Sequence, residues 1–175
     1  MANTYYAIAT VTVPATPAAT IDFTSIPQTY TDLQILLSAR SNRVGDNDFP
    51  VITFNGSSTG FDASYMYATA GGASSFQSTT QSYAYINSST FAANTFSNTM
   101  FYIPRYTDTT IPKSFLIESV VENTSIDTNK FVLMTSGGKT STTAAISSIR
   151  LQCIVSGTNS FVQYTTATLY GIKNS

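Results

Sequence analysis

The chain has 175 residues, eight of them basic and nine acidic, for a net charge of −1, and it contains neither histidine nor tryptophan. Serine and threonine fill 52 of the 175 positions, and only 10% of the residues are charged. This composition excludes a basic surface for a nucleic-acid backbone. The 42% of hydrophobic residues excludes disorder caused by low hydrophobicity.

The length is that of one domain, which we expect to span residues 1–175. Residues 1–6 lack a basic segment followed by an apolar run, so we expect no signal peptide. No apolar run approaches the roughly 20 residues that cross a bilayer, so we expect no membrane partner. Because chain ends are unordered unless they are bound, residues 1–6 are also a candidate N-terminal arm.

Apolar and polar residues alternate along much of the chain, and this two-residue period is typical of half-buried strands. Proline, glycine and asparagine separate the alternating segments, and no segment has the period of an amphipathic helix. The pattern predicts an all-β fold, an antiparallel two-sheet sandwich like a jelly roll, with about ten strands. In chain order the expected strands are Tyr5–Val13, Thr20–Phe23, Leu33–Arg40, Val51–Phe54, Tyr83–Asn87, Thr99–Ile103, Phe115–Glu122, Lys130–Met134, Ile149–Val155 and Phe161–Tyr170.

Residues 57–82 differ from the strands around them. Serine, threonine, glycine and alanine dominate this segment, with a few aromatic residues among them. We expect it to be a long loop inserted between sandwich strands, and loops of this length commonly have a function or a partner.

Two short patterns match catalytic or nucleotide-binding motifs only in part. Gly137-Gly138-Lys139-Thr140 ends like a phosphate-binding loop, but the glycine required five positions before Gly138 is Leu133. Ser136 and Lys139 have the spacing of a Ser-x-x-Lys nucleophile, but the partner motifs are missing. We interpret the two glycines as a turn between strands and expect no nucleotide cofactor.

The carboxylates offer little for hydrolysis. Strand periodicity places Glu118 and Glu122 about 13 Å apart on one face, beyond the separation that glycosidases use. A pairing of Asp46 or Asp48 with another carboxylate stays open, as does a structural Ca²⁺ at Asp46-Asn47-Asp48, where a polar turn is the simpler interpretation. Cys153 lies on the apolar side of its strand and has no histidine partner in the chain. We therefore expect no enzymatic activity and no metal or other cofactor.

Tyrosine is abundant for a core alone, with 11 residues. Tyrosine among small polar residues is typical of adaptable contact surfaces, and it also stacks on sugar rings. An alternative is that the tyrosines line the sandwich edges with their hydroxyls in water. The candidate partner-contact residues are Tyr5, Tyr6, Tyr65, Tyr67, Phe76, Tyr83 and Tyr85.

A set of segments occurs in a fixed order from Thr20 onwards. They are Thr20–Leu33, Ser38–Arg40, Phe54–Gly56, Tyr102–Tyr106, Lys113-Ser114, Ala144–Leu151, Phe161–Tyr164 and Leu169–Lys173. This set resembles a group of small structural proteins of tailed bacteriophages, of the kind found in phages of aquatic bacteria, cyanophages among them. The resemblance implies a β-sandwich protein of the virion, made in the host cytoplasm, and it supplies no catalytic residues.

Within that group we expect a capsid decoration or cement protein that stabilises the shell through protein–protein contacts. The implied partners are the major capsid protein or other virion proteins, with a homotrimer as the implied oligomer. The alternative is a tail- or fibre-associated adhesin that binds host surface glycans through its tyrosine-rich segments.

Overall fold

A computed structural model describes residues 4–45, 47–69, 72–80, 82–121, 132–153 and 159–173. The described part folds into eleven strands and no helix. The strands are β1 (Tyr5–Thr12), β2 (Thr20–Phe23), β3 (Asp32–Ala39), β4 (Pro50–Phe54), β5 (Phe61–Thr69), β6 (Gly72–Ser78), β7 (Ser97–Ile103), β8 (Lys113–Val120), β9 (Val132–Lys139), β10 (Ile149–Cys153) and β11 (Thr166–Ile172).

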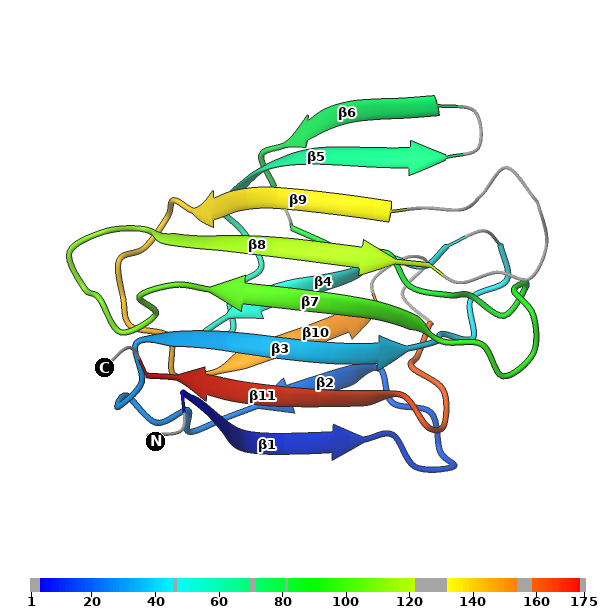
Figure 1. Cartoon of the computed structure of the whole chain (residues 1–175), viewed down its shortest axis with the longest axis horizontal. Helices are drawn as coiled ribbons and strands as arrows, with labels where there is room; N and C mark the ends of the chain where they lie inside the picture. The colour runs from blue at the N-terminus through cyan, green and yellow to red at the C-terminus, as the bar shows by residue number, and fades with distance from the viewer. Residues whose placement is uncertain are drawn as a thin grey trace.

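These strands form two antiparallel sheets. The large sheet has eight strands in the order β1-β11-β3-β7-β8-β9-β5-β6, and the small sheet has three in the order β2-β10-β4. Figure 1 shows the small sheet behind one part of the large sheet, while the near face of the large sheet has no layer over it. The predicted all-β, antiparallel two-sheet sandwich is confirmed.

The core lies between the two sheets, where alternate residues of each strand point inward. On β3 the side chains of Leu33, Ile35 and Leu37 are buried, as the alternation predicts. On β10 the side chains of Ile149 and Leu151 meet them from the small sheet and belong to the same buried cluster. The large sheet is therefore apolar and covered on its inner face along these strands.

The jelly-roll connectivity stays a prediction, and the small sheet has one further neighbour beside its three strands. Tyr83 and Ile86 bridge to Val51 of β4 and to Asp48 just before it. The segment 83–86 thus lies beside β4, in the position of a fourth strand of the small sheet. The expected strand Tyr83–Asn87 takes the form of isolated bridges here.

The long inserted segment differs from the expected loop. Residues 57–82 contain the antiparallel hairpin β5–β6, which pairs through β9 with the rest of the large sheet. In β6, serine, alanine and glycine hide the strand pattern, because these residues have little strand preference of their own. The insertion therefore widens the large sheet.

Three boundaries also depart from the sequence expectation. Tyr5 and Tyr6 pair with β11 as part of β1, so they do not belong to a free N-terminal arm, and residues 1–3 lie outside the described part. Gly137 and Gly138 lie inside β9, so the expected turn there is wrong. β11 begins at Thr166, after isolated bridges from Phe161 to Ala18 and Ser41, because Tyr164 has a left-handed backbone (φ 70°) that interrupts the strand.

Residues 54–56 and 144–151 meet in space. Asn55, at the end of β4, accepts hydrogen bonds on its Oδ1 from the backbone N–H groups of Ser147 (2.9 Å) and Ser148 (3.1 Å). Its Nδ2 donates to the carbonyl oxygen of Ala145 at 2.8 Å. The Asn55 side chain therefore fixes the approach to β10 against the end of β4.

Candidate docking surface on the large sheet

The aromatic candidates from the sequence divide into two groups. Tyr65 is fully buried and Tyr85 is 9% exposed, so neither offers contact surface, and the assignment of both as partner contacts is corrected. The ring of Tyr65 packs against the rings of Phe76 and Tyr83, with centroid distances of 4.4 Å and 4.7 Å, and those two rings are 6.1 Å from each other. Burial raises the pKa of Tyr65, which is the effect of removing a phenol from water.

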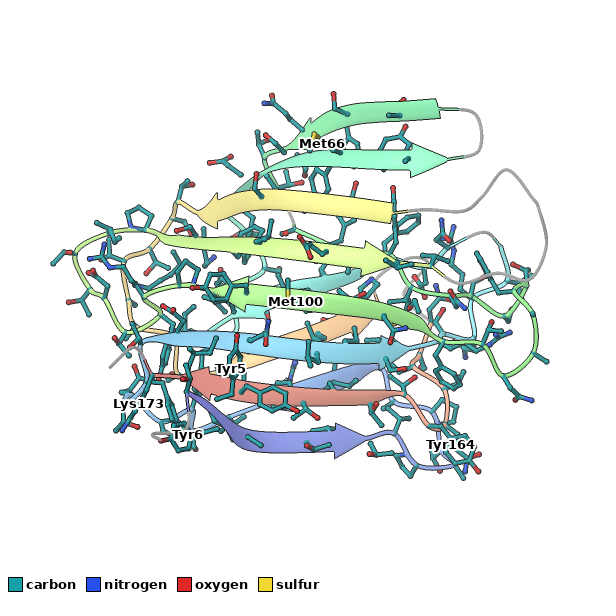
Figure 2. All side chains as sticks on the ribbon, in the orientation of Figure 1. Tyr5, Tyr6, Met66, Met100, Tyr164 and Lys173 are labelled. Atoms are coloured by element: carbon teal, nitrogen blue, oxygen red, sulfur yellow. The ribbon has the colours of Figure 1, made fainter. Side chains whose placement is uncertain are left out.

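The remaining candidates are partly accessible. Tyr67 and Phe76 are half-buried and their rings meet edge to face at 6.0 Å. Figure 2 shows Tyr5 projecting from the open face of the large sheet, where it is 54% exposed and its ring meets Tyr170. Tyr6 is half-buried against Tyr30. The structure thus does not bring the seven candidates together into one surface.

The open face of the large sheet presents apolar side chains that the sequence interpretation missed. Leu36 is 46% exposed, Val120 47% and Met66 60%. Figure 2 shows Met66 and Met100 on this same face, on β5 and β7. The signal was present in the sequence, because Leu36 and Val120 occupy positions of their strands that alternation assigns to the polar side.

A shallow groove of about 650 Å³ crosses this face over β11, β3, β7 and β8. Its outward side chains form rows across the strands, because the register places Thr168, Leu36, Met100 and Glu118 side by side. The neighbouring row is Thr166, Ser38, Asn98 and Val120. The outward residues that line the groove are Leu36, Ser38, Asn98, Met100, Glu118, Val120, Thr166, Thr168 and Tyr170.

The basic residues of the strands do not reach this face. Lys113 and Lys139 are paired on β8 and β9, point inward and are 2% and 1% exposed. Lys139 donates to the hydroxyl of Ser57 and the carbonyl of Thr59, and Lys113 donates to the carbonyl of Asp108. Burial lowers the pKa of both lysines. These lysines hold loops against the end of the sandwich, which explains Lys139 without nucleotide binding.

The other candidates for chemistry remain inside the protein. Cys153 is buried, and burial together with nearby Asp48 raises the pKa of its thiol. Asp48 and Asn47 are also buried, while Asp46 lies outside the described residues, as does Glu122. In the described ranges no three histidine, cysteine, aspartate or glutamate side chains gather to hold a metal ion. Those ranges also contain no helix long and apolar enough to cross a bilayer.

Comparison of the chain with protein-family models, with curated proteins and with solved structures finds no match. The open face of the large sheet and its groove are therefore characterised by their own geometry: wide, nearly uncharged and partly apolar.

Proposed function

We propose that the chain is a non-enzymatic structural protein of a bacteriophage virion, a decoration or cement protein that attaches to the shell through the open face of its large sheet. The resemblance in sequence supports the virion, and the nature of the open face supports attachment to protein. The partner in this proposal is the major capsid protein, and the chain acts as a homotrimer.

The observation on which this rests is the open face itself. Eight strands spaced about 4.8 Å apart, each with about seven paired residues, cover roughly 800 Å². A stable protein interface buries about 800 Å² on each partner. Leu36, Met66 and Val120 supply apolar area there, and the few charges mean that little water must be stripped from ions on contact.

The alternative, a tail-associated adhesin for glycans, depended mainly on Tyr65 and its neighbours. Because Tyr65 is buried, the described structure contains no exposed tyrosine cluster at the β5–β6 hairpin. The adhesin stays a prediction without a structural observation in its favour. Glycan hydrolysis would require a pair of carboxylates, and in the described part of the chain the groove contains only Glu118.

The test is the copy number of the protein on purified particles of the phage that encodes it, followed by cryo-EM of those particles. Hundreds of copies placed on the shell, with the large sheet facing it, support the proposal. A dozen or two copies on the tail support the adhesin, and absence from the particle overturns both.

A matched pair of variants tests the face. Leu36→Asp should lower shell occupancy, because it places a second carboxylate in the groove. Val44→Asp makes the same kind of change at a loop residue that is 87% exposed and lies outside the groove, and it should leave occupancy unchanged. Equal occupancy of both variants would show that attachment uses another surface.

A further inference from the structure

Glu118 is the one acidic residue that lines the groove in the described structure. It lies on β8 opposite Met100 of β7, and Leu36 of β3 is the next side chain in the same row. Its side chain is half-buried by these apolar neighbours. The carboxylate is therefore set into a surface that otherwise offers thioether, aliphatic and hydroxyl groups.

Glu118 has no partner of its own within the described ranges. The two ion pairs there are Arg105–Asp108 and Arg150–Asp22, and neither lies on the open face. No described hydrogen bond ends on Glu118, and none of the described basic residues occupies an outward position on the eight strands. Bulk water is thus what stabilises this charge in the isolated chain.

Covering the groove would remove that water. An unpaired carboxylate in a protein interior costs several kcal/mol, whereas a well-placed cation recovers most of this cost. A second copy that packs through the same face offers no cation among the described outward residues of its eight strands, and it would bury two unpaired glutamates. The charge on the open face therefore selects against a face-to-face homodimer and for a different partner surface.

We propose that the groove binds a partner protein that is largely uncharged and projects one lysine or arginine side chain onto Glu118. The aliphatic stem of such a side chain fits beside Leu36 and Met100, and its charged end reaches the carboxylate. This inference rests on the proposed function, because it names the partner chemistry at the same face.

The test uses butylguanidinium, an aliphatic cation, and butylurea, its neutral analogue of the same shape. Binding is followed by NMR on the intact chain with labelled methionine methyl groups, of which Met100 lines the groove. Butylguanidinium should shift the Met100 signal saturably, and butylurea should bind about fivefold more weakly, a difference of about 1 kcal/mol.

Two variants make the result specific. Glu118→Gln should reduce the affinity for butylguanidinium to that for butylurea. Asp62→Asn removes the carboxylate of an outward residue on β5 outside the groove, and it should change nothing. Equal binding of the two compounds, no saturable shift, or no effect of Glu118→Gln would overturn the inference.

The particle assay separates this inference from the proposed function. If Glu118→Gln retains full occupancy on the shell while Leu36→Asp loses it, attachment through the open face is supported and a partner cation at Glu118 is excluded. If the wild-type chain is absent from particles, the proposed function fails, whereas the NMR result still reports whether the groove selects a cation.

Discussion

The ring of Tyr65 on β5 stacks on the ring of Phe76 on β6, with centroids 4.4 Å apart and 1° between the ring planes. The ring of Tyr83 also packs against Tyr65 at 4.7 Å and lies 6.1 Å from Phe76, so the three rings contact one another. This three-ring stack joins the inserted hairpin to the segment beside β4. Tyr65, which lies in the inserted residues 57–82, therefore stabilises the fold through these ring contacts.

We expect Tyr65→Ala to lower the free energy of unfolding by about 3–5 kcal/mol, because it removes a buried aromatic side chain and two stacking contacts. Urea unfolding followed by circular dichroism measures the change. Tyr164→Ala, at a ring that is 68% exposed, is the control and should stay within about 0.5 kcal/mol of wild type. A small loss at Tyr65 would mean that the stack contributes little.

Arg40 should stabilise the loop after residue 88, because its guanidinium donates to four carbonyl oxygens there. The acceptors are Ala92 (2.6 Å), Phe91 (2.9 Å), Thr95 (3.1 Å) and Ser89 (3.1 Å). We expect Arg40→Met to cost about 2 kcal/mol, since hydrogen bonds from a charged donor exceed neutral ones in strength.

Arg150→Met provides the comparison for Arg40→Met. Arg150 pairs with Asp22 on the surface, where both side chains are exposed, and such pairs contribute little to stability because water screens them. Denaturant unfolding of both variants should rank Arg40→Met as clearly the more destabilised. The reverse order would show that water replaces the guanidinium at the carbonyls without cost.

Gly137→Ala should destabilise the pairing of β9 with β5. A methyl group at Gly137 would lie 2.3 Å from the carbonyl oxygen of Asp62 and 2.8 Å from the Cα of Ala63, both backbone atoms that move only if the strands separate. We expect a loss of about 1–3 kcal/mol, as in other overpacked sites. Gly138→Ala, one residue along the same strand, meets its nearest atom at 3.1 Å and should cost less in the same thermal or urea unfolding measurement.

The sequence predicted most of the strands that have one buried face and not those without it. Strand β3 was located within a residue because its apolar residues recur at every second position. Strand β6 escaped prediction because its glycine, alanine and serine residues carry no such period. Strand β5 alternates between buried Phe61, Ala63 and Tyr65 and exposed residues, and the sequence interpretation overlooked that period. Which strands become neighbours depends on contacts far apart in the chain, and periodicity contains no information about them.

The groove on the open face was harder to predict than the strands, because it depends on which strands become neighbours. Alternation places Tyr65 and Met66 on opposite faces, but only the pairing of β5 with β9 decides which of those faces is covered. Leu36 and Val120 were visible as apolar residues on a polar side. That the two residues belong to one exposed surface follows only from the strand order, in which β3, β7 and β8 are neighbours, and from the lack of a layer over this face.

Alkaline pH should reveal the contact between Tyr102 and Asp32, whose Oδ2 accepts a hydrogen bond from the tyrosine hydroxyl at 2.8 Å. Burial, together with this hydrogen bond and the aspartate charge, raises the pKa of Tyr102 to about 12. In the unfolded chain a tyrosine has a pKa of about 10, so the unfolded state loses this proton first. The stabilisation from Tyr102 is therefore fully present below pH 10 and is lost as the pH rises to about 12.

We expect the free energy of unfolding of Tyr102→Phe to fall less steeply than that of wild type between about pH 10 and pH 12, since phenylalanine has no proton to release. Urea unfolding at a series of pH values measures both slopes, and the contribution of the Cys153 thiol is the same in the two proteins. Tyr164→Phe, at the exposed loop ring, should follow wild type. Parallel curves for wild type and Tyr102→Phe would show that the phenol titrates alike in the folded and unfolded chains.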